Sequence, residues 1–279
     1  HIENTSDRMV NHLGNWKNGE LGDFVTLKRG FDLPQQKRED GQVPIFSSSG
    51  ITGTHSTAMV KAPGVITGRY GTIGEVFYAA KDFWPLNTTL FVEDFHGNDA
   101  KFIYYFLKTL EWSKFTSASA VPGINRNTVH KEIVSLPDIE TQRRIASTLS
   151  MFDEKIKINT EINDNLQQQA QAIYSSMFID NPDPAWSHGH LSDLITVKYG
   201  KDHKKLADGI YPVYGSGGIM RYVERPLYNK ESVLIPRKGT LNNVMYVNQP
   251  FWSVDTMFYT EMKLPNVAKF VYHFVKAKD

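Results

Sequence analysis

The feature that most constrains this sequence is an internal repeat. Residues 21–30 align with residues 191–200 at an offset of 170, and five of the ten positions are identical. Residues 43–51 then align with residues 211–219 at an offset of 168, which holds for further blocks as far as 100–106. Chance similarity between β-rich segments is the alternative, but ordered blocks that share one offset are typical of a duplicated structural unit.

The pattern of apolar residues in each repeat indicates a sheet with a short helix at its end. Apolar runs are short, rich in Val, Ile, Phe and Tyr, and interrupted by Gly and Pro, which is typical of strands joined by tight turns. Residues 100–110 and 266–276 instead carry apolar side chains at three-to-four spacing. The expected fold class is α+β, with two repeated sheet-based domains joined by a long coiled-coil helix.

The segment between the repeats, Ile139 to Phe178, contains neither Gly nor Pro and predicts one long helix. Apolar and amide side chains recur along it in alternating steps of four and three, the pattern of a coiled-coil seam. At about 1.5 Å per residue the seam would span roughly 50 Å, so the helix can act as a spacer. The seam residues are Ile145, Leu149, Phe152, Ile156, Asn159, Asn163, Leu166, Ala170, Ile173 and Met177.

Two asparagines on this seam lead to a further prediction. Paired Asn159 and Asn163 would fix the register of a coiled coil, whereas in an ordinary amphipathic helix they would be two solvated polar breaks. The second repeat ends at Asp279, which corresponds to Glu111, so we expect an incomplete second copy with no second helix. An exposed seam would then favour a homodimer through antiparallel pairing.

Composition excludes several classes of protein. Cysteine is absent, which excludes disulfides, thiolate zinc sites and a cysteine nucleophile. The net charge of +1 excludes a uniformly basic nucleic-acid binder. The sequence also lacks the roughly 18 consecutive apolar residues of a membrane span. We expect no membrane association and a cytoplasmic location.

Several segments resemble catalytic motifs without completing them. Residues 181–184, Asn-Pro-Asp-Pro, lack the second consecutive Pro and the aromatic residue of an amino-methyltransferase motif. The glycines in 68–74 precede an expected strand rather than a helix, unlike a phosphate-binding loop. Asp153 and Lys155 point about 200° apart on a helix, unlike a nuclease pair. His188 and His190 have no nearby metal ligands. We expect a non-catalytic chain and no bound metal.

The turns of both repeats offer groups that suit DNA. Residues 193–240 hold nine basic and five acidic side chains, against six and four in residues 23–74. Arg69 and Arg237 occupy equivalent turns, from which a guanidinium can reach a guanine edge. The alternatives are a solvated charged face and, for Arg69, a local ion pair with Glu75.

Specific motifs strengthen the DNA interpretation. These are the Trp-x-x-Gly-x-Leu-x-Asp openings at Trp16 and Trp186, the Pro-Ile-Phe-Ser-Ser-Ser-Gly segment at 44–50, the Ile-Thr-Gly-Arg-Tyr-Gly-Thr-Ile-Gly run at 66–74, and Leu-Pro before Thr-Gln-Arg-Arg-Ile at 141–145. Over residues 16–279 the chain resembles the specificity subunit of type I restriction-modification systems. Two recognition heads on a spacer also suit a target with two half-sites.

The resemblance implies an architecture and a set of partners. In this family two target-recognition domains alternate with two helices that form an antiparallel coiled coil, and each domain reads half of a split double-stranded DNA target. The helices dock two modification subunits, which methylate adenine with S-adenosylmethionine, and restriction subunits that use ATP and Mg join them. The chain itself is then non-enzymatic and binds no cofactor. The implied domains are 1–138, the spacer helix 139–178, and an incomplete 179–279.

The candidate DNA-binding residues are those whose type and place in a turn suit base or phosphate contact. They are Lys28, Arg29, Ser48, Arg69, Tyr70, Asn125 and Arg126 in the first repeat, and Lys204, Lys205, Ser216, Arg237 and Lys238 in the second. The rival function is a coiled-coil scaffold without DNA-binding competence. A stand-alone nuclease is a third hypothesis, which the broken motifs disfavour.

Overall fold

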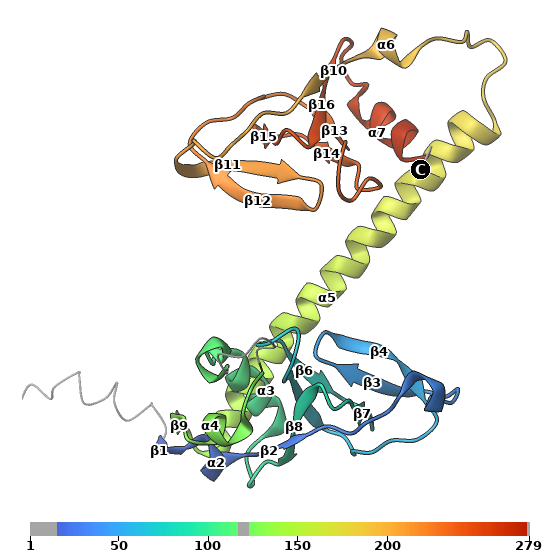
Figure 1. The fold of residues 1–279 in the computed structure, drawn as a ribbon. Coiled ribbons are helices and arrows are strands. Elements are labelled where there is room, and N and C mark those ends of the chain that lie inside the picture. The colour runs from blue at the N-terminus through green and yellow to red at the C-terminus, as the bar shows by residue number, and fades with distance from the viewer. Residues whose placement is uncertain (1–15, 117–122, 278–279) are drawn as a thin grey trace, which may run out of the picture. The chain divides into compact units, whose positions relative to one another are not determined.

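The computed structural model describes residues 16–116 and 123–277, and the chain forms two compact units that divide between Ile158 and Asn159. Each unit combines sheets with helices, which confirms the α+β class (Figure 1). In the described parts of the chain, no helix has both the length and the apolar character that a membrane span requires.

The first unit contains a four-stranded sheet in the order β2-β8-β5-β6, a three-stranded sheet β4-β3-β7 and a two-stranded sheet β1-β9. Its strands are β1 (Lys17–Glu20), β2 (Thr26–Arg29), β3 (Val43–Ser47), β4 (Gly50–His55), β5 (Gly64–Gly68), β6 (Val76–Ala79), β7 (Trp84–Pro85), β8 (Thr89–Asp94) and β9 (Ile133–Leu136). Its short helices are α2 (Leu21–Phe24), α3 (Ala100–Lys108), α4 (Arg126–His130) and the 3₁₀ turns Gln35–Lys37 and Trp112–Phe115.

Burial explains these elements. Every residue of β5 is buried, which is why its sequence, Gly-Val-Ile-Thr-Gly, shows no polar alternation. Helix α3 begins where the Asp99 carboxylate accepts a hydrogen bond from the Phe102 N–H at 2.8 Å. It buries Phe102, Ile103 and Leu107 in the core that β5 and β8 share with it.

The second unit repeats the topology of the two larger sheets. Its sheets have the orders β10-β16-β13-β14 and β12-β11-β15, which match β2-β8-β5-β6 and β4-β3-β7 strand for strand. The register matches too, because Ile66 lies opposite Phe91 and Leu234 lies opposite Tyr259 at an offset of 168. The predicted repeat is confirmed. The elements are α6 (Leu191–Leu194), β10 (Ile195–Tyr199), β11 (Asp208–Gly215), β12 (Gly218–Val223), β13 (Ser232–Pro236), β14 (Met245–Val247), β15 (Trp252–Ser253), β16 (Met257–Met262) and α7 (Ala268–Lys276).

One long helix, α5 (Ile139–Ser175), continues into a π-helical turn at Ser176–Asp180, which confirms the helix predicted over 139–178. Its beginning packs in the first unit, where Gln142 and Ala146 are buried. Its end packs in the second unit, where the ring centroids of Tyr174 and Phe270 on α7 are 5.5 Å apart. The functional division into 1–138, 139–178 and 179–279 stays a prediction.

A buried amide attaches α5 to the first unit. The Gln142 side chain is 2% exposed, and its Oε1 accepts a hydrogen bond from the Asp99 N–H at 3.0 Å. Its Nε2 donates to the Asn98 Oδ1 at 2.7 Å and to the Pro137 carbonyl at 2.9 Å. Three partners from two segments therefore fix where the helix begins relative to α3.

We expect Gln142→Leu to destabilise the first unit by about 2 kcal/mol, because it removes the Gln142 partner of the half-buried Asp99 N–H, of the Asn98 oxygen and of the buried Pro137 carbonyl. Chemical denaturation monitored by circular dichroism measures this change. Gln168→Leu, at an exposed position of the same helix, is the matched control and should stay within about 0.5 kcal/mol of wild type. Equal stability of the two variants would contradict the role given to Gln142.

Candidate nucleic-acid interface

A polar cavity of about 480 Å³ lies at the end of the four-stranded sheet in the first unit. Five of the seven residues predicted for DNA binding in this unit line it, although they come from three separate segments. The predicted residues are Arg29, Arg69, Tyr70, Asn125 and Arg126, and the others are Leu90, Gly123, Ile124 and Asn127. Three guanidinium groups thus surround one hollow, which makes it an anion-attracting site.

Arg69 is held by its backbone on both sides. Its N–H and that of Tyr70 both donate to the Thr88 carbonyl, at 2.8 and 3.2 Å, and its own carbonyl accepts from the Ile124 N–H at 3.0 Å. Its guanidinium carbon lies 4.5 Å from the centre of the Tyr70 ring. In the described part of the chain no ion pair joins Arg69 to Glu75, so the guanidinium keeps donors for a ligand.

Asn125 and Arg126 begin the short helix α4. The Asn125 Oδ1 accepts a hydrogen bond from the Asn127 N–H at 3.0 Å, which caps the helix. Val129 is fully buried and anchors the same turn in the core. Asn125 and Arg126 remain exposed, so the core positions their backbone while their side chains face the cavity.

Two lysine–glutamate pairs show why Lys28 does not line the cavity. The Lys28 ammonium forms an ion pair with Glu93, and Lys198 and Glu261 form the equivalent pair at 3.7 Å in the second unit. Neighbouring side chains on a strand point to opposite faces, so Lys28 points away from the face that Arg29 occupies. The repetition of both residues in the sequence was the available signal for this structural pairing.

Ser48 and Ser216 lie beside the glycine turns that follow the two arginines. Gly71 has a φ of +79°, and a β-carbon there would come within 3.2 Å of the Ser48 Oγ. Gly239 has a φ of +85° and faces Ser216 even more closely. Each serine therefore lies next to the turn that contains the arginine, which is the turn of Arg69 and Gly71 in the first unit and that of Arg237 and Gly239 in the second. Both turns need glycine.

The second unit presents an equivalent arginine with different neighbours. The N–H groups of Arg237 and Lys238 donate to the Thr256 carbonyl at 2.9 and 3.2 Å, as in the first unit. The Arg237 guanidinium lies 5.4 Å from the centre of the Tyr199 ring and 6.0 Å from that of Phe258. Sequence reasoning missed Tyr199, although the repeat aligns it with Arg29.

The remaining predicted lysines of the second unit are exposed, and two of them occupy a turn of their own. Lys204 and Lys205 follow Asp202, whose carboxylate accepts a hydrogen bond from the Lys204 N–H at 3.0 Å. This bond lowers the pKa of Asp202. The turn precedes β11, whereas Lys238 follows β13 beside Arg237. Unlike Lys238, these two lysines lie outside the turn that contains Arg237.

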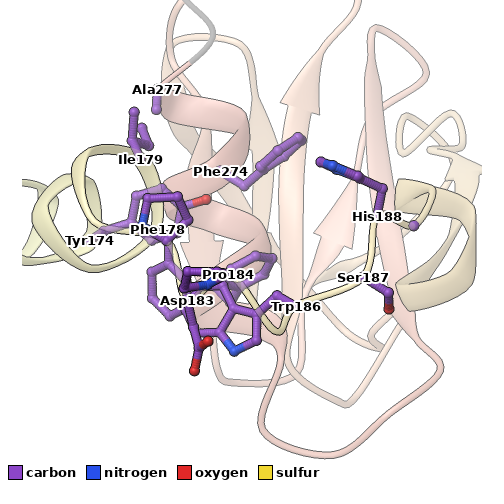
Figure 2. A pocket seen from close by; sticks show the side chains of 13 residues that line it. Tyr174, Phe178, Ile179, Asp183, Pro184, Trp186, Ser187, His188, Phe274 and Ala277 are labelled. Atoms are coloured by element: carbon purple, nitrogen blue, oxygen red, sulfur yellow. The ribbon is translucent and has the colours of Figure 1, made fainter.

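A second cavity, of about 640 Å³, lies in the second unit between the end of α5, the following linker and α7 (Figure 2). Most of its lining residues are apolar, and several of them are aromatic. The rings of Phe178 and Trp186 stack with centroids 5.4 Å apart. No predicted DNA-binding residue lines it, and neither arginine nor lysine is among its lining residues. The cavity therefore suits apolar contacts rather than a nucleic acid.

The predicted helix-pairing residues lie mostly on the surface of α5. Ile145 is half-buried against the core of the first unit, whereas Asn159 and Asn163 are exposed. The exposed fractions of the remaining apolar members are 37% for Leu149, 60% for Phe152, 65% for Ile156, 57% for Leu166 and 61% for Ile173. Most of the seam is therefore accessible.

Across residues 16–116 and 123–277, no three histidine, aspartate or glutamate side chains gather as metal ligands. His188 lies in the linker before α6, and His190 precedes the first residue of that helix.

Comparison with known proteins gives one consistent result. Residues 14–168 match the family described as the type I restriction modification DNA specificity domain. A Mycoplasma pneumoniae protein named as a type I specificity subunit is 28% identical over 92% of this chain and 75% of its own length. The HindI specificity subunit of Haemophilus influenzae is 37% identical over 26% of this chain and 17% of its own.

The fold is also similar to a solved structure. The crystal structure of the S subunit of a type I restriction-modification system from M. genitalium superposes with a TM-score of 0.65 at 22% identity. The match covers 96% of this chain and 78% of that one. At this identity the likeness concerns the fold.

A histidine at the end of α4 bonds this helix to the neighbouring strand β2. His130 ends α4, and its Nε2 accepts a hydrogen bond from the Leu27 N–H at 2.9 Å. This bond requires the neutral ring. Burial, with smaller effects of Arg126 and His96, lowers the pKa of His130. The folded unit therefore holds fewer protons at this position than the unfolded chain.

We expect the first unit to lose stability as the pH falls below the unfolded histidine pKa of about 6.5, until the lowered folded-state pKa is reached. Denaturant unfolding at pH 7.5 and at pH 5.5, compared for wild type and His130→Gln, measures this dependence. Gln can accept the Leu27 N–H bond without titrating, so the variant should show the weaker pH dependence. Identical pH dependence in both proteins would contradict the assignment.

Proposed function

This chain belongs to the type I restriction-modification DNA specificity family, and we propose that it is the subunit that selects the double-stranded DNA target of such a complex. The observation that carries the proposal is the cavity formed by Arg29, Arg69, Tyr70, Asn125 and Arg126. A guanidinium donates to both acceptors of a guanine edge, and an asparagine amide pairs with adenine. The cavity thus supplies the two commonest groups for reading bases in the major groove.

The target is bipartite, with one half-site for each unit. Support comes from the repeated backbone geometry of Arg69 and Arg237, each of which follows a central strand and bonds to one threonine carbonyl. Two arginines in equivalent turns can each read a guanine in its own half-site. Ser48, Ser216 and Lys238, next to these turns, contact phosphates and so set the orientation of each unit on the duplex. Lys204 and Lys205 provide further phosphate contacts.

The chemistry of the complex resides on partner subunits in this proposal. The chain is a non-enzymatic subunit that binds no cofactor of its own. Modification subunits supply S-adenosylmethionine and methylate adenine, and restriction subunits use ATP and Mg. The α5 helix sets the spacing of the half-sites and docks the modification subunits. A subunit that selects DNA works beside the chromosome, so the proposed location is the cytoplasm.

The exposed seam of α5 favours a second candidate function, that of a scaffold. Phe152, Ile156 and Leu166 are each more than half exposed, as expected for a surface that assembles with another helix. A second copy of this chain is the occupant we propose, because an antiparallel heptad seam is self-complementary. The dependence of binding on salt concentration distinguishes the two candidate functions. DNA binding weakens steeply with ionic strength, whereas apolar helix pairing does not.

We expect Arg69→Ala and Arg237→Ala each to weaken binding of the target by about 1–3 kcal/mol and to relax the preference for one base pair in one half-site only. The target is first identified by mapping adenine methylation by the complex assembled with modification subunits. Binding to duplexes with single base changes, at one fixed salt concentration, then measures the effect. Lys61→Ala, at an exposed position outside the cavity, is the control. Equal and base-independent losses in all three variants would contradict base reading.

We expect the chain to self-associate, and Leu149→Asp with Phe152→Asp to abolish this by placing charges on the seam. Light scattering over a range of protein concentrations measures the mass. The matched control is Ser147→Asp with Gln168→Asp, since both residues are exposed on α5 but lie off the seam. A monomeric mass for the wild type at every concentration would contradict the homodimer. Binding of a modification subunit by this monomer would instead support docking of that subunit on α5.

A further inference from the structure

The two units place different side chains at one equivalent position. Arg29 and Tyr199 are the last residues of β2 and β10, opposite Leu90 and Phe258 respectively. The residue after each is a glycine whose N–H donates to the opposite strand, at 3.1 Å for Gly30 and 3.0 Å for Gly200. The backbones therefore match, and both side chains leave the sheet at the same point beside the recognition arginine.

The surroundings of Tyr199 indicate a contact surface rather than core packing. Its side chain is 64% exposed, and its ring meets Phe258 edge to face at 5.0 Å. The Arg237 guanidinium lies near both rings. A rigid, exposed aromatic group that is already supported by a second ring loses little conformational entropy when it binds.

Arg29 offers the opposite chemistry. Its side chain is 53% exposed, and it pairs with Asp32 at 3.8 Å, where Asp32 is itself 69% exposed. A solvent-exposed pair at this distance is weak, so Arg29 can exchange it for a nucleic-acid acceptor. The first unit thus surrounds Arg69 with further guanidinium groups, whereas the second surrounds Arg237 with aromatic rings.

We propose that position 29/199 is a specificity position, and that Tyr199 reads a thymine through an apolar contact with the thymine methyl group beside the base bound by Arg237. Thymine is the base that presents a methyl group in the major groove, and apolar side chains recognise it there. Arg29 at the matching position donates to a guanine edge instead. The proposal rests on the proposed function. It adds that the two half-sites differ at this position because tyrosine contacts a thymine methyl group whereas arginine donates to a guanine edge.

Replacement of single thymines by uracil tests the contact, because it removes only the methyl group. The full chain, assembled with its modification subunits, is measured on its mapped target with uracil at each thymine of the second half-site in turn. One replacement should weaken wild-type binding about fourfold, the loss expected for one buried methyl group. Tyr199→Ala should bind the thymine and uracil duplexes equally, and Tyr199→Phe should still distinguish them.

The exchange variants provide a second test. Tyr199→Arg should change the preference at that one position from thymine to guanine and leave the first half-site unaltered. Arg29→Tyr should make the reverse change in the first half-site only. Both substitutions reproduce the residue that the other unit already accommodates on the same backbone, so the folded units should persist.

The outcomes distinguish this inference from the function on which it rests. Specific binding by the wild type with no loss at any uracil, or with the same loss in Tyr199→Ala, overturns the role of Tyr199 and leaves the proposed function standing. Absence of sequence-specific binding by the wild-type complex overturns both. Loss of both half-site preferences in Tyr199→Arg would also overturn it, since a specificity residue acts on its own half-site.

Discussion

In each unit, the turn that carries the arginine depends on one carbonyl oxygen that accepts two backbone hydrogen bonds. Thr88 accepts from Arg69 and the next residue, and Thr256 accepts from Arg237 and the next residue, with distances that agree within 0.1 Å between units. The shared oxygen fixes the start of the turn, so the arginine always leaves the central strand at the same place. A fixed backbone reduces the conformational entropy that a contact to DNA would cost.

The two units share the backbone of this turn but differ in the side chains that surround its arginine. The serine packed against Gly71 recurs against Gly239, and the lysine–glutamate pair of the first sheet recurs in the second. The side chains around the arginine do not recur, as Arg29 and Tyr199 show. A duplicated sheet whose buried face is kept and whose strand ends vary can present two different surfaces without changing its fold.

The sequence predicted the parts of this structure that have a period or a repeat. The duplicated unit followed from the offset, α5 followed from the heptad spacing, and five cavity residues followed from their side-chain types, whereas the strand order was not predicted. The meeting of Tyr70 with Gly123 was not predictable, because a single bridge between distant segments leaves no periodic pattern. The ion pair between Lys28 and Glu93 was not predictable either, because the two residues lie 65 positions apart in sequence, and the role of Lys28 in DNA binding stays a prediction. Tyr199 was missed because the candidates in the second repeat were lysines, an arginine and a serine, and no aromatic side chain was among them.

Each end of α5 is attached to its own unit by apolar packing together with side-chain hydrogen bonds. Gln142 bonds to Asp99 and Asn98 at one end, and Gln171 bonds to His273 at the other. These contacts fix the helix without using Phe152, Ile156 or Leu166, which stay exposed. Burying such side chains is worth about 25 cal/mol per Å². The apolar area of α5 that stays exposed is therefore the surface on which the proposed assembly with another helix rests.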